Sequence, residues 1–97
     1  MKDLDKLEDE VHDEKSFIIF LEALAQDKLE EEKKENESPS NPYGAGHNGW
    51  EHSRIGDYLE AASAWAESSI NGLPYMPKET NPWKRVAQIL HAGKIYE

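Results

Sequence analysis

The chain has 97 residues, the length of a single domain, and its formal net charge is −9. It contains no cysteine, which excludes a disulfide framework and a thiolate metal site. A charge of this sign is repelled by nucleic acids and by anionic membrane surfaces, so we expect neither as a partner. The three tryptophans, four tyrosines and two phenylalanines indicate a specific core, because each aromatic side chain can bury about 150 Å² or more.

The first predicted helix covers residues 3–12. Leu4, Leu7 and Val11 follow a helical spacing and form one narrow apolar stripe. Asp3 is placed to cap the amino end of this helix. A thin stripe suits a helix that packs across a core made by the other helices.

The second predicted helix, residues 14–36, has the strongest pattern. Asp13 is its expected cap, and Phe17, Phe20, Leu21 and Leu24 share one face. The segment 18–19 adds two isoleucines outside that face. A helix that is apolar on most sides either is central to its fold or contacts a partner, so Ile18 and Ile19 are a candidate seam for a structural homodimer.

A loop of glycine, proline, asparagine and serine residues follows, and we expect segment 37–49 to be flexible. The third predicted helix covers residues 53–70, with Ser53 as its cap and Gly72 after its end. Tyr58, Leu59, Ala62 and Trp65 lie on its apolar stripe.

The fourth predicted helix covers residues 82–92. It opens with Asn81 as cap and Pro82 at the first helical position, and Gly93 is expected to close it. The sequence therefore predicts an all-α fold, a small bundle of about four helices in one domain spanning residues 1–97. The predicted core consists of Phe17, Phe20, Leu21, Leu24, Tyr58, Leu59, Ala62, Trp65, Trp83, Val86 and Leu90.

Residues able to bind a metal are sparse. His47 and His52, with Glu51 between them, are the one cluster of candidate ligands, and their separation does not match a familiar zinc spacing. We expect these residues to be polar loop and cap residues, and we expect no cofactor. No pair of carboxylates or nucleophile with a base is placed for catalysis, so we expect the protein not to be an enzyme. A small metal-binding protein or enzyme using His47, His52 and Glu51 is the alternative.

The charge is concentrated in one part of the chain. Residues 1–38 carry fourteen acids against six lysines, whereas the remainder carries six acids against five bases. An acidic surface attracts a basic protein, and small acidic immunity or antitoxin proteins mask basic toxins in this way. We therefore predict a protein-interaction module with a basic partner. The candidate contact residues are two acids and three aromatic residues outside the predicted core: Glu30, Glu31, Tyr43, Trp50 and Tyr75.

The longest apolar run, residues 17–21, is far shorter than the roughly 20 residues that cross a bilayer. The first five residues lack the basic and then apolar layout of a signal peptide. We therefore expect a cytoplasmic protein.

The order of the motifs resembles a family of small bacterial proteins that is catalogued as a domain of unknown function. The resemblance rests on segment 17–24, on Trp50 leading into Asp-Tyr-Leu-Glu-Ala at 57–61 with Trp65, and on Pro82-Trp83 through 87–90 to Lys-Ile-Tyr-Glu at 94–97. It spans nearly the whole chain. The resemblance implies the same helical fold, and it implies no catalytic residue.

Overall fold

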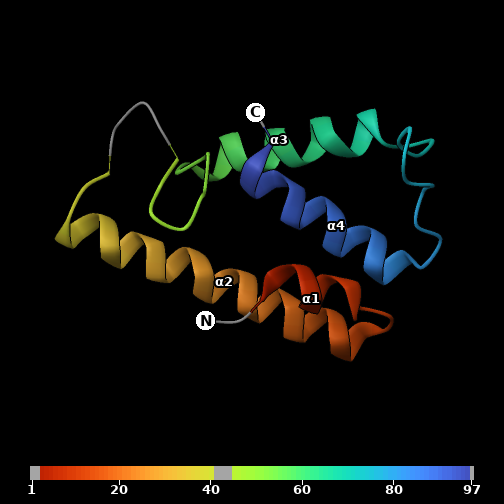
Figure 1. Cartoon of the computed structure of the whole chain (residues 1–97), viewed down its shortest axis with the longest axis horizontal. Coiled ribbons are helices and arrows are strands. Elements are labelled where there is room, and N and C mark those ends of the chain that lie inside the picture. Colours follow the sequence, from red (N-terminus) through yellow and green to blue (C-terminus); the bar gives the residue numbers. More distant parts are fainter. Residues whose placement is uncertain (1–2, 41–44, 97) are drawn as a thin grey trace.

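The computed structural model describes residues 3–40 and 45–96 of the chain. Within these residues the chain forms four helices, and the β-type pairing there is a single isolated bridge between Leu73 and Met76. The all-α prediction is confirmed. The helices are α1 (Leu4–Asp9), α2 (Glu14–Glu37), α3 (Ile55–Ser68) and α4 (Pro82–Ile95) (Figure 1). None of the described helices is both long enough and apolar enough to cross a membrane.

Three of the four helices begin where the sequence predicts, because their caps act locally. The Asp3 carboxylate accepts a hydrogen bond from the Lys6 amide. Asp13 and Ser16 form a reciprocal capping box at the start of α2, and the Asn81 side chain accepts from two amides of α4. Ser53 does not cap α3. The extended residue before that helix is Arg54, and its side chain makes no capping hydrogen bond.

α3 ends at Ser68, two residues before the predicted end at residue 70. The ends of α1 and α4 each differ from the prediction by three residues, in both cases because of tertiary packing. α1 ends at Asp9, and the turn that follows buries Val11 completely. Gly93 does not end α4, which continues to Ile95. A Cβ added at Gly93 would lie 2.9 Å from Tyr58 Cε1 and 3.0 Å from Ala62 Cβ on α3. This glycine is therefore needed for the close approach of α3 and α4.

The central element is α4, which packs against each of the other three helices. α1 lies against α2 and α4, whereas α3 packs on α4 alone (Figure 1). On α4, Lys84 and His91 pair with carboxylates of α1, and Val86 lies about 200° around the helix from Lys84. The face of the bundle that carries Val86 therefore points away from α1.

The buried core is smaller than the sequence predicts. Phe20, Leu24 and Ala62 are buried as expected, and Phe17, Tyr58 and Leu90 are half-buried against the core. Trp65 is half-buried as well. The other buried hydrophobic residues are Leu4, Val11, Ala23, Trp50, Ala61 and Ala87.

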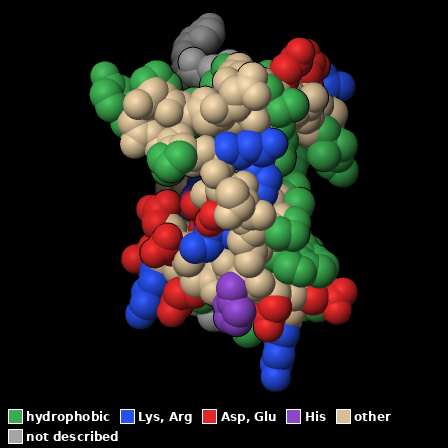
Figure 2. All heavy atoms as spheres, turned by 90° about the vertical axis from the view of Figure 1, so that its right-hand side faces the viewer, with side chains coloured by type: hydrophobic (Ala, Val, Ile, Leu, Met, Phe, Trp, Pro, Cys, Tyr) green, Lys and Arg blue, Asp and Glu red, His purple; other side chains and the backbone are tan. Residues whose placement is uncertain are grey.

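Four residues predicted as core are exposed: Leu21, Leu59, Trp83 and Val86. These residues lie on apolar stripes that are wider than the surface that the neighbouring helices cover. Trp83 retains 36% of its surface, although its ring lies 5.6 Å from that of Phe17. Figure 2 shows hydrophobic side chains gathered along the right-hand edge of the view, from the level of α3 down to that of α2. The fold thus leaves an apolar face without a covering helix among the described residues.

Candidate functional site

Trp50 is fixed in place between α2 and α4 and is only 7% exposed. Its indole N–H donates to Asp27 Oδ2 at 2.8 Å, and the same oxygen accepts from Lys94 Nζ at 2.8 Å. Lys28 and Lys94 lie 5.5 Å and 5.7 Å from the centre of the indole ring, in cation–π range. Trp50 was predicted to lie outside the core, and this part of the prediction is wrong because the indole belongs to the core cluster.

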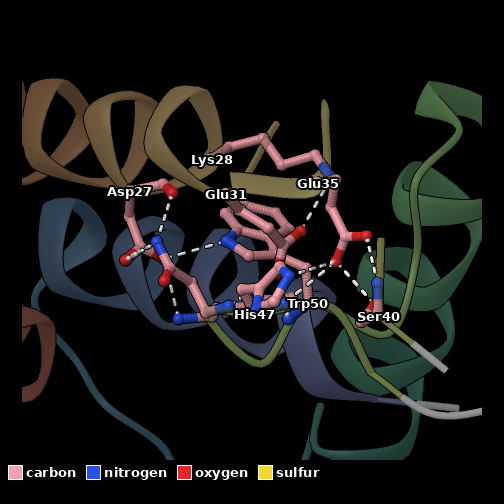
Figure 3. A network of polar contacts seen from close by, with 9 residues as sticks. Asp27, Lys28, Glu31, Glu35, Ser40, His47 and Trp50 are labelled. Atoms are coloured by element: carbon pink, nitrogen blue, oxygen red, sulfur yellow. Dashed lines mark hydrogen bonds and ion pairs between the residues drawn. The ribbon is translucent and has the colours of Figure 1, made fainter. Parts of the chain in front are cut away.

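Glu31 is the organising residue of the glycine-containing loop before Trp50 (Figure 3). Its carboxylate is buried, and one oxygen accepts from the backbone amides of Asn48 at 2.9 Å and Trp50 at 3.2 Å. The other oxygen pairs with Lys28 Nζ at 3.0 Å. A Cβ at Gly46 would lie 2.3 Å from a Glu31 oxygen, which explains the glycine there. Glu31 is therefore a buried anchor and not a contact residue.

Glu35 ties a second part of the same loop to α2. It accepts from the Ser40 hydroxyl at 2.6 Å and from the Ser40 and His47 amides at 2.9 Å and 3.2 Å. The Ser40 hydrogen bonds lower the pKa of Glu35. The described parts of segment 37–49 are thus held to α2 by two carboxylates. Tyr43, another predicted contact residue, lies outside the described residues.

Every buried side-chain nitrogen or oxygen in the described part of the chain has a hydrogen-bond partner. The network around Asp27 and Glu31 therefore has its bonding capacity used internally, which is typical of a structural network. Its effect is to hold the Trp50 ring against Tyr58, with the ring centres 5.6 Å apart. These two rings form one wall of a groove.

The groove runs between α2 and the beginning of α3 and has a volume of about 220 Å³. Burial raises the pKa of Tyr58, and its hydroxyl donates to the Leu90 carbonyl at 2.6 Å. Two cationic side chains, Lys28 and Arg54, border an otherwise mainly apolar surface. The other lining residues are Leu21, Leu24, Ala25, Trp50, His52, Ser53, Ile55 and Tyr58.

A larger hollow of about 620 Å³ lies between α1, α2 and the end of α4, but its lining is mostly charged or polar. Several of those groups already have partners within the protein: Lys94 pairs with Asp27, His91 with Glu8, and Lys34 with Asn48 and Glu30. A ligand there would have to displace these internal partners. We therefore regard the apolar groove as the better candidate site.

The structure does not bring the candidate metal ligands together. The His52 ring contacts the Tyr96 carbonyl at 2.6 Å, and the His47 ring contacts the Ser38 carbonyl beside α2. Glu51 is exposed, and its backbone amide donates to Lys94. Among residues 3–40 and 45–96, no group of three or more His, Asp or Glu side chains is arranged to hold a metal ion.

Tyr75 and Glu30 are the remaining predicted contact residues, and both are on the surface. Tyr75 is 99% exposed at the tip of the tight turn closed by Leu73 and Met76. Glu30 pairs with Lys34 at 2.9 Å, which is the i, i+4 contact expected from the sequence. Neither residue lines the groove.

Leu21 and Leu59 are predicted core residues, whereas Ile55 begins the predicted apolar stripe of the third helix and is not in the predicted core. In the structure Leu21 and Ile55 line the groove, and Leu59 lies one helical turn beyond Ile55. A signal was present in the sequence, because the apolar arc of the second helix is too wide for a single contact face.

A family model described as "Family of unknown function (DUF7660)" matches residues 13–97, which contain α2, α3 and α4 but not α1. No curated protein matches the chain. No solved structure matches it either.

Proposed function

Because the chain belongs to this family of unknown function, its role has to be argued from its surface, and we propose that it is a non-enzymatic protein-interaction module. It binds a segment of another protein in the groove between α2 and α3. The observation that supports the proposal most directly is that large apolar side chains, Leu21 and Ile55, stand exposed around a groove. Exposed apolar patches of this kind mark interaction sites.

The size of the groove favours side chains of a protein over a small-molecule ligand. Pockets for drug-sized ligands usually measure about 300–1,000 Å³, and this groove has a volume of about 220 Å³. Trp50 and Tyr58 give it a wall that is held before any partner arrives. A wall of this kind reduces the ordering cost of binding.

A basic partner, as an immunity or antitoxin-like protein would have, stays a prediction. Its support is the acidic composition of residues 1–38, with exposed acids on α1 and α2 such as Asp5 and Glu22. Contact through those acids would be driven by charge, and at about 1 M salt the screening length falls to about 3 Å. Binding anchored in an apolar groove would persist under the same conditions.

The test is affinity capture with two matched variants. Leu21 is 41% exposed and lines the groove, whereas Ile19 is 44% exposed on the same helix and does not. We expect Leu21→Asp to lose proteins that the wild-type chain and Ile19→Asp both retain at about 1 M salt. Identical sets of captured proteins for all three chains would contradict the proposal.

The same variants decide whether the partner is a second copy of this chain. Ile18 and Ile19 are both exposed, so they are available to form the homodimer seam predicted from the sequence. Light scattering over a wide concentration range would detect the dimer. A dimer that Ile19→Asp dissociates and Leu21→Asp leaves intact would favour that alternative over groove binding.

A further inference from the structure

We infer that the occupant of the groove is a protein segment that presents two neighbouring apolar side chains and an acidic side chain beside them. The inference rests on the proposed function, since it assumes that the groove binds protein. It departs from the sequence-based expectation of a basic partner. The reason is that the charge at the groove is opposite in sign to the charge of the whole chain.

The two cations at the groove are not equivalent. Lys28 Nζ lies 3.0 Å from the buried Glu31 carboxylate and 5.5 Å from the Trp50 ring, so its charge is compensated internally. No ion pair within the described residues involves Arg54, which also makes no capping hydrogen bond at the start of α3. Arg54 is exposed and lines the groove. Its guanidinium is therefore available to a carboxylate of a partner.

Within the described residues, no acid near the groove forms an ion pair with Arg54. Asp57 and Glu60 border a different hollow, together with Ala61 and Ala64 of α3. Of the acids at the end of α2, Glu30 pairs with Lys34 and Glu35 accepts a hydrogen bond from Ser40. At physiological ionic strength the screening length is about 8 Å, so acids elsewhere on a molecule with extents of 41 × 27 × 22 Å act weakly at Arg54.

The apolar part of the occupant follows from the lining. Leu21 and Ala25 are one turn apart on α2, and Ile55 and Tyr58 are one turn apart on α3, so each wall offers an apolar strip of about one turn. A volume of about 220 Å³ between these strips suits a few side chains and no larger group. Arg54 immediately precedes Ile55, which places the acidic side chain of the occupant beside its apolar pair.

The experiment uses a phage-displayed library of random 12-residue peptides selected on the immobilised full chain. Four chains are compared: wild type, Ile19→Asp as the matched control, Leu21→Asp, and Arg54→Glu. Arg54 is exposed and has no ion-pair partner in the described residues, so we expect Arg54→Glu to fold like the wild type. Circular dichroism and thermal melting of each chain verify the fold.

We expect wild type and Ile19→Asp to enrich peptides with Asp or Glu next to two aliphatic or aromatic residues, and Leu21→Asp not to retain these peptides. Arg54→Glu should bind them about fivefold more weakly, the size of one partly exposed ion pair. In its own selection it should enrich Lys or Arg at the same place.

Two different results would overturn the reasoning at two different levels. If no peptide is enriched, or if the enriched peptides bind Leu21→Asp as well as wild type, the groove does not bind protein and the proposed function fails too. If binding requires Leu21 but the enriched peptides are neutral or basic, or if Arg54→Glu binds them equally, only the acidic occupant is refuted.

Discussion

Gly93 offers the sharpest test of the packing that holds the groove in shape, because its neighbour Tyr58 forms part of the groove wall. In Gly93→Ala the new methyl group would meet Tyr58 Cε1 at 2.9 Å and Ala62 Cβ at 3.0 Å. Gly56 is a matched control, since it also lies in a helix but has nothing within 4 Å of an added Cβ. The two variants introduce the same atoms into different surroundings.

The expected magnitudes follow from two opposing effects. Replacing a helical glycine by alanine stabilises a helix by up to about 1 kcal/mol. At Gly56 this is the main effect, so we expect Gly56→Ala to raise the free energy of unfolding by up to about 1 kcal/mol. At Gly93 overpacking costs about 1–3 kcal/mol and offsets or exceeds that gain. The difference between the two variants isolates the overpacking cost of about 1–3 kcal/mol.

The assay is urea unfolding of both variants, supported by thermal melting. A difference of this size corresponds to roughly 5–20 °C between the two melting temperatures for a domain of this length. Gly93→Ala should also perturb peptide binding in the groove, because the displaced residue is Tyr58. The reasoning is refuted if Gly93→Ala is as stable as Gly56→Ala, since α3 and α4 would then have room for the methyl group.

Two further predictions concern carboxylates. Glu31→Ala removes the acceptor of two backbone amides and of Lys28, so we expect it to lower the free energy of unfolding by about 2–4 kcal/mol. Glu30→Ala breaks only an exposed ion pair and should lower the free energy of unfolding, measured by urea titration, by about 0.5 kcal/mol or less. If Glu31→Ala and Glu30→Ala lower this free energy equally, Glu31 is not an anchor. The Ser16 hydrogen bonds lower the pKa of Asp13 below its ordinary 3.8. The ionised carboxylate therefore stabilises the folded state at pH values above 3.8. This stabilisation is lost as the pH falls through the lowered pKa of the folded state. The stability of wild type relative to Asp13→Asn should therefore be constant above about pH 6 and decline towards about pH 2.5, and a constant difference over that range would contradict the assignment.

The sequence by itself determined the helices, because their signals are local. A capping carboxylate or amide bonds to amides two or three residues away, so Asp3, Asp13 and Asn81 mark their helices without reference to the rest of the chain. The Glu30–Lys34 pair is local in the same sense. The starts of these three helices were predicted correctly for that reason.

Tertiary structure alone decided which apolar residues are buried. Trp50 follows a glycine-containing loop and looked exposed. Its backbone amide and its indole N–H, however, bond to Glu31 and Asp27 of α2, which are 19 and 23 residues away in the sequence. Trp83 and Leu21 lie on regular helical stripes and looked buried, yet α3 packs only on α4, and 36% of Trp83 and 41% of Leu21 stay exposed. A helical period shows that a face is apolar, but not whether another helix reaches it. The groove and the Arg54 charge beside it became visible only once the positions of α2 and α3 around α4 were known.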